Sequence, residues 1–135
     1  MNPIVDLASQ IRSFRSFLPA KEFETSLRFY QAIGFETYRL GDTLAEMSLG
    51  KHAFLLQGYY VKAFAENMMM HVLVEDAAAW WRHLDSLDLP NQFGVSPHEP
   101  KAEPWGLTVT YLTDPAGVLW HFAQMTGEEP DSSAR

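Results

Sequence analysis

A chain of 135 residues, of which 47% are apolar and 13% aromatic, can bury one hydrophobic core, so we expect a single domain. Its 17 acidic and 10 basic side chains give a formal net charge of −7, which argues against nucleic acid as a partner and favours cationic ligands. The absence of cysteine excludes disulfides, thiolate nucleophiles and cysteine-based zinc sites, and is typical of a cytoplasmic protein. The N-terminus has no export pattern and no uncharged apolar stretch approaches the ~20 residues that span a bilayer, so we expect no membrane association.

The first half of the chain predicts a β-α-β-β-β unit. Residues 14–18 form a short apolar run before Pro19, and apolar side chains then recur at helical spacing until Gly34. These helical positions are Phe23, Leu27, Tyr30 and Ile33. Three strand-like runs with turn residues between them follow, at about 35–40, 43–49 and 52–57.

The second half repeats this order. Residues 68–74 form an apolar strand, Asp76 is a candidate helix cap, and the helical spacing then returns. Its core positions each lie 54 residues after those of the first helix, at Ala77, Trp81, Leu84 and Leu87. A constant offset at four positions indicates an internal duplication, with modules at about 13–58 and 68–125. The later extended segments are expected near 93–97, 107–113 and 118–124.

Two features bound the end of the second module. The tetrapeptide Asp114-Pro115-Ala116-Gly117 suits a type I turn, which would join two adjacent antiparallel strands. From residue 126 the chain is rich in glycine, proline, serine and acidic residues, so we expect residues 126–135 to be a flexible tail.

Several short motifs are more specific than this order of elements. They are Ser26-Leu27-Arg28-Phe29-Tyr30, Gly34-Phe35, Pro104-Trp105-Gly106, Asp114-Pro115-x-Gly117 and His121-Phe122. Together they cover roughly residues 13–125 and resemble the glyoxalase, bleomycin-resistance protein and dioxygenase superfamily, also called the vicinal-oxygen-chelate superfamily, with the bleomycin-resistance-like proteins nearest in motif. The resemblance implies an α+β fold in which two tandem β-α-β-β-β modules form a curved mixed sheet around a cleft. It also implies a homodimer whose two chains share the ligand-binding surface.

The superfamily contains metal-dependent enzymes and metal-free binding proteins. Its enzymes place one metal ligand on the first strand of each module and one near the last strand. In this chain the resemblance puts these positions on Arg15, Met69 and His121, and on either Leu55 or Gln57. Only His121 is a good ligand for a hard divalent ion, and catalytic sites generally need three protein ligands, so we expect no metal and no other cofactor.

A rearranged metal site is the alternative. Strand alternation puts His71 on the same face as Met69 and brings it near His121, where two histidines could share a metal with Glu46 or Glu103. The protein would then be a glyoxalase-type or dioxygenase-type lyase or isomerase. The sequence contains no nucleophilic triad, HExxH helix or glycine-rich phosphate loop, so it assigns no catalytic residue.

The favoured hypothesis is a metal-independent protein that binds a small molecule, with an antibiotic as one candidate, and acts by sequestration. The predicted ligand-binding residues are Arg15, Phe17, Met69, His71, Trp105 and His121. The acidic composition favours a cationic ligand, whereas Arg15 would attract a carboxylate or phosphate. A third hypothesis is a protein-interaction module that uses the aromatic stretch at residues 59–64.

Three of the four tryptophans have distinct expected roles. Trp105 lies between a proline and a glycine in a loop, where an exposed indole can stack on a ligand. Trp81 has the spacing of a core residue on the second helix, and Trp120 has the opposite strand parity from His121 and should pack under the helices. We therefore expect ligand contact from Trp105.

Overall fold

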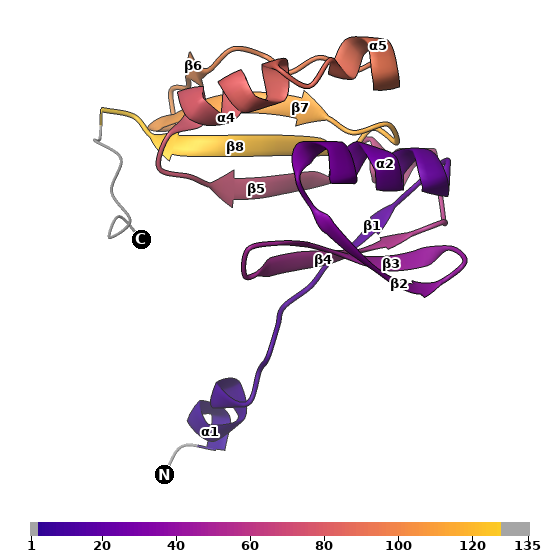
Figure 1. Cartoon of the computed structure of the whole chain (residues 1–135). Coiled ribbons are helices and arrows are strands. Elements are labelled where there is room, and N and C mark those ends of the chain that lie inside the picture. The colour runs from indigo at the N-terminus through magenta and orange to yellow at the C-terminus, as the bar shows by residue number, and fades with distance from the viewer. Residues whose placement is uncertain (1–2, 128–135) are drawn as a thin grey trace.

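The computed structural model describes residues 3–127, which form two four-stranded mixed sheets with helices packed on them (Figure 1). The elements in chain order are α1 (Pro3–Ser9), β1 (Phe17–Pro19), α2 (Phe23–Ile33), β2 (Glu36–Gly41), β3 (Leu44–Leu49), β4 (His52–Gln57), α3 (Lys62–Ala65), β5 (Met69–Leu73), α4 (Ala77–Asp85), α5 (Leu89–Phe93), β6 (Lys101–Ala102), β7 (Leu107–Thr113) and β8 (Leu119–Met125). The strand orders are β1-β4-β3-β2 in the first sheet, sheet A, and β5-β8-β7-β6 in the second, sheet B.

Each sheet is one β-α-β-β-β unit. The first strand of each unit runs parallel to the last, and the remaining neighbours are antiparallel. The predicted α+β class is confirmed, although the strands form two separate sheets and not one continuous sheet. No helix within residues 3–127 is long and apolar enough to cross a bilayer. The predicted tail lies, from residue 128 onward, outside the described residues.

Local interactions explain where α2 ends and where α4 begins. The apolar stripe of α2 is buried, and Gly34 ends the helix at φ +133 while its N–H bonds back to the last turn. At α4 the Asp76 side chain accepts a hydrogen bond from the Ala79 N–H, as an N-cap residue does. The expected core role of Trp81 is wrong, because Trp80 packs against the core instead and stacks on Phe122 with ring centroids 4.8 Å apart.

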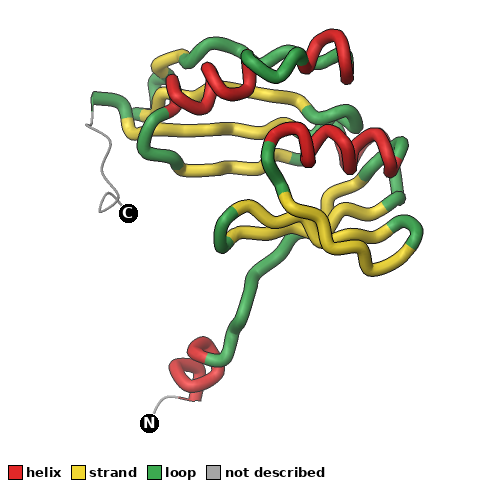
Figure 2. The backbone as a smooth tube through the Cα atoms, viewed as in Figure 1, coloured by secondary structure: helices red, strands yellow, loops and turns green. Residues whose placement is uncertain are grey.

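Two segments differ from the sequence-based expectation. Residues 93–97 are not a strand, since Phe93 ends the short helix α5, which has a proline in its first turn, and the edge of sheet B is the two-residue strand β6. At the other end, β1 begins at Phe17 and not at residue 14. Residues 3–14 instead form an N-terminal arm, made of α1 and an extended segment, that stands away from the sheets (Figures 1 and 2).

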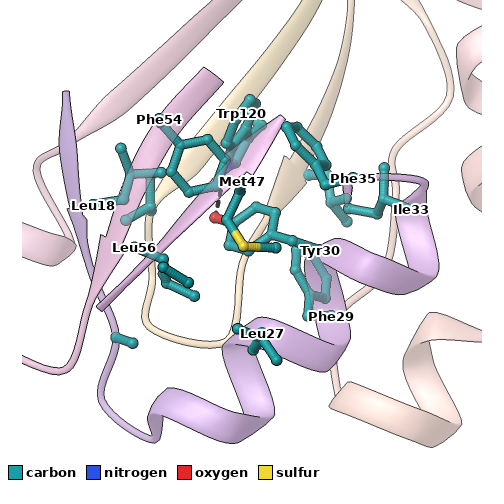
Figure 3. Packing of buried hydrophobic residues seen from close by; sticks show 14 of the residues in the cluster. Leu18, Leu27, Phe29, Tyr30, Ile33, Phe35, Met47, Phe54, Leu56 and Trp120 are labelled. Atoms are coloured by element: carbon teal, nitrogen blue, oxygen red, sulfur yellow. Dashed lines mark hydrogen bonds between the residues drawn. The ribbon is translucent and has the colours of Figure 1, made fainter. Parts of the chain in front are cut away.

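One hydrophobic core runs through both modules. Tyr30 on α2 and Phe54 on β4 contact Trp120 on β8, with ring centroids 5.7 and 5.6 Å from the indole (Figure 3). The buried Tyr30 hydroxyl donates to Asp114 Oδ2 at 2.5 Å and accepts from Trp120 Nε1 at 3.0 Å. Aromatic packing and a buried polar network therefore join the first module to the β7–β8 turn of the second.

This shared core decides which sheet faces stay open. Phe54 in sheet A and Trp120 in sheet B both point into this core. The helix-covered faces of the two sheets therefore border the same hydrophobic core. Because successive residues of a strand point to opposite faces, Leu55 and His121 lie on the faces turned away from the core. We call these the open faces of sheets A and B. Each lies outside the shared core, so the two do not enclose a cleft between them within one chain.

Gly117 closes the β7–β8 turn at φ +102, and a Cβ at this position would lie 3.1 Å from Glu66 Cγ. Gly117→Ala should therefore lower the free energy of unfolding by about 1–2 kcal/mol, because alanine disfavours this backbone conformation. Urea denaturation followed by circular dichroism measures the change. Gly41→Ala is the control, since Gly41 has open space around it and no positive φ. An equal loss in both variants would contradict the backbone explanation.

Candidate functional site

A row of three rings crosses the open face of sheet B. The register pairs His71 on β5 with His121 on β8, and His121 with Tyr111 on β7. The ring centroids of His71 and His121 are 6.0 Å apart, and the Tyr111 ring meets His121 edge-on at 4.8 Å. The predicted proximity of the two histidines is therefore what the strand register produces.

His121 is the electrostatically distinctive member of this row. Burial lowers the pKa of its imidazole, the neighbouring His71 lowers it further, and Glu103 opposes both effects. Its Nε2 atom is buried and has no hydrogen-bond partner within residues 3–127. A neutral imidazole with an unused ring nitrogen can accept or donate one hydrogen bond to a ligand.

Tyr111 and Glu103 complete the row at its other end. The Tyr111 hydroxyl donates to Glu103 Oε2 at 2.5 Å, and burial together with this carboxylate raises the pKa of Tyr111 to about 12. The Glu103 side chain is only 9% exposed, so its charge is held close to the row. Sequence reasoning missed Tyr111, although its strand parity relative to the 114–117 turn places it beside His121.

The open face of sheet A carries an apolar counterpart. Phe17 pairs with Leu55 across β1 and β4, and the 54-residue offset makes Phe17 the equivalent of His71. The first module, which lacks the histidine row, therefore presents the apolar side chains of Phe17 and Leu55 at the positions equivalent to His71 and His121. Phe17 is 52% exposed, which leaves it available for contact.

Arg15 does not present a free charge on this face. Its guanidinium lies 3.3 Å from Glu46 Oε1, and its Nε donates to Ser13 Oγ at 2.9 Å. The ion pair offsets the attraction that Arg15 would exert on an anion. In the sequence, Arg15 favours an anionic ligand and the acidic composition favours a cationic one. The ion pair with Glu46 weakens the case for an anionic ligand.

The six predicted ligand-binding residues fall into three places. Met69, His71 and His121 share the open face of sheet B, with Met69 62% exposed. Arg15 and Phe17 lie at the start of sheet A, and Trp105 is exposed in the loop between β6 and β7. Contact between these residues and a ligand stays a prediction.

The strand registers give a fit test for a metal ion. Arg15 precedes β1, while Phe17 pairs with Leu55 and His71 pairs with His121. Among residues 3–127, no group of three or more histidine, cysteine, aspartate or glutamate side chains is placed to hold a metal ion. The residues present therefore do not fit a divalent site with three protein ligands, whether standard or rearranged through Glu46 or Glu103.

Comparisons with known proteins agree on the architecture. No family model and no curated protein matches the sequence. Among solved structures, the bleomycin resistance determinant encoded on transposon Tn5 superposes with a TM-score of 0.71 at 20% identity, over 86% of this chain and 99% of that chain. The bleomycin-binding protein from Streptomyces verticillus, complexed with copper(II)-bleomycin, gives 0.70 at 20% identity, over 88% and 98%. Lactoylglutathione lyase from Agrobacterium tumefaciens gives 0.62 at 16% identity, over 82% and 91%.

This chain has the glyoxalase and bleomycin-resistance fold. The resemblance read from its motifs is thus confirmed at the level of the fold. The similar structures include both an enzyme and bleomycin-binding proteins, so the fold alone does not decide between catalysis and binding.

A crevice of about 630 Å³ lies beside the histidine row, between residues 49–54 and β5. We call it the β5 crevice. Its walls are mostly apolar and aromatic, and they include Trp80 and Trp120 from the second module and Phe54 from the first. His71 belongs to both the crevice and the open face of sheet B, because β5 is the edge strand of its sheet. Nothing in the sequence pattern indicated this crevice, since it depends on how the two modules pack.

Proposed function

We propose that this protein binds a small organic molecule on the open face of sheet B and acts by sequestering it, without making or breaking a bond. The observation that carries the proposal is the row of His71, His121 and Tyr111. It combines an unused imidazole nitrogen with ring surfaces, and exposed Met69 and Leu73 extend the apolar area beside it. A few placed polar groups within apolar surroundings are typical of ligand sites.

The ligand class that the chain favours is cationic and partly aromatic. The net charge is −7 and Arg15 beside the open face of sheet A is paired with Glu46, so long-range attraction favours a positive ligand. Exposed Trp105 adds an indole that can stack on a planar or cationic group. Bleomycin is the first compound to test, because two solved structures with this fold are a bleomycin resistance determinant and a bleomycin-binding protein.

The functional unit in this proposal is a homodimer. The N-terminal arm exposes Val5, Leu7, Ile11 and Phe14, each between 57 and 92%. Apolar side chains gathered on one exposed segment mark a protein contact, and a second copy would cover them. A two-fold dimer would also set the open face of sheet A in one chain against the open face of sheet B in the other. Phe17 and His121 would then line the same site from different chains.

Titration with bleomycin and with copper(II)-bleomycin, followed by tryptophan fluorescence and calorimetry, tests the proposal. We expect saturable binding with a dissociation constant of about 1 μM or lower, and an affinity at least ~10-fold weaker in His121→Leu, because the ligand loses its hydrogen bond to the imidazole. His83→Leu makes the same chemical change at an exposed position on α4, away from the row, and should bind as the wild type does. Equal affinities in the two variants would contradict the site, and no saturable binding to the wild type would contradict the ligand class.

A further inference from the structure

We propose that the β5 crevice is a second binding site, and that it takes a planar aromatic or heteroaromatic molecule of about two or three rings. Its volume of about 630 Å³ falls within the ~300–1,000 Å³ range of small-molecule pockets. This inference depends on neither the open-face ligand nor the dimer, since most of the crevice lies on the helix side of β5.

The walls of the crevice determine the shape of molecule that it takes. Phe35 and Phe54 contribute rings from the first module, and Trp80 and Trp120 contribute indoles from the second. Phe35, Phe54 and Trp120 pack on one another with ring centroids 5.4–5.9 Å apart, so they form one continuous aromatic wall. Such a wall favours a flat guest, which can pack edge-on or offset against several rings at once. Leu49 and Met70 add aliphatic surface to the wall, and the flexible Met70 side chain can adapt to the outline of the guest.

The polar groups of the crevice determine the chemistry of the guest. β5 is the last strand of sheet B, so the backbone N–H and C=O groups on its outer side face the crevice and not a neighbouring strand. The imidazoles of His52 and His71 also line the crevice. A ring that carries an N–H donor beside an acceptor can bond to a strand edge as an added strand does. The site therefore favours aromatic amines and amides over purely hydrocarbon rings.

N-phenyl-1-naphthylamine is a suitable probe, because it is flat, uncharged and carries an N–H donor. Its fluorescence, excited by energy transfer from Trp80 and Trp120, should rise to saturation at one probe per chain. Ala53→Phe puts a ring into the crevice and should weaken binding at least ~10-fold. Gln57→Phe is the matched control, since Gln57 lies on the same strand and face but does not line the crevice, and its affinity should be unchanged. His52→Phe, at an exposed position in the crevice wall, repeats the test with little risk to folding.

Three results would overturn the proposal. Equal affinities in Ala53→Phe, His52→Phe and Gln57→Phe would show that the probe does not enter the crevice. Binding that is lost in Met69→Ala but kept in Ala53→Phe would place the probe on the open face of sheet B. An affinity that rises at least ~10-fold when residues 1–12 are deleted would show that the N-terminal arm, and not a small molecule, normally fills the crevice.

Discussion

Replacing Asp114 with alanine should lower the free energy of unfolding by about 3–5 kcal/mol, because it leaves three buried donors without an acceptor, each at a cost of about 1–3 kcal/mol. The Asp114 carboxylate is 1% exposed and accepts hydrogen bonds from the Tyr30 hydroxyl at 2.5 Å and from the Ala116 and Val118 N–H groups at 2.9 Å. Urea denaturation measures the loss. The exposed Tyr38 gives the control, since Tyr38→Phe should change the stability by less than about 0.5 kcal/mol.

The pH dependence of this effect has a definite sign. Burial raises the pKa of Asp114, while the bonds from Tyr30 and the backbone amides oppose that rise. A carboxyl whose folded-state pKa is raised contributes stability that is fully present below its unfolded pKa and is lost as pH rises through the folded pKa. The free energy of unfolding of the wild type, compared with that of Asp114→Asn, should therefore be highest in acid. This difference should decrease as pH rises above about 4. The opposite trend would mean that the donors hold the carboxylate ionised.

Local patterns predicted α2 and α4, and tertiary packing decided most of the rest. The spacing of Phe23 to Ile33 specifies α2 because a helix buries one stripe, whatever its partner. The same rule named Trp81 on α4, but the residue that stacks on Phe122 is its neighbour Trp80. The extended interpretation of residues 93–97 failed for a similar reason, since a short apolar run does not distinguish a strand from a helix turn.

The sequence could predict only those parts of the candidate site that follow from the alternation of side chains along a strand. Parity along β5 and β8 put His71 and His121 on one face, and counting from the 114–117 turn would have added Tyr111. The hydrogen bond from Tyr111 to Glu103 depends on the course of the loop before β7, and the pairing of Arg15 with Glu46 depends on the start of β1. Neither contact leaves a periodic signal in the sequence. The duplication offset was informative, since it relates Phe17 to His71, which the strand registers pair with Leu55 and His121.

Mixing two binding-deficient variants should restore ligand binding, if the open faces of two chains build each site. Phe17→Asp changes only the open face of sheet A and His121→Leu only that of sheet B, so every site in either homodimer has one altered half. In a mixed dimer, one site carries both alterations and the other carries neither. Random reassociation of equal amounts should therefore recover about a quarter of the wild-type sites, and a purified mixed dimer about half.

The restoration is measured by calorimetric titration with bleomycin, after the two tagged variants are co-expressed and the mixed dimer is isolated. Tyr59→Asp is the control for the added charge, because Tyr59 is 57% exposed on the connection between the modules and lies on neither open face. It should bind fully as a homodimer. If Phe17→Asp alone keeps full affinity, the site lies on sheet B of one chain. If the mixed dimer stays inactive although each variant is folded, the two faces do not meet across the interface. Restored binding would instead show that His121 of one chain and Phe17 of the other serve the same ligand, which a single chain cannot achieve because its open faces lie on the outside of a shared core.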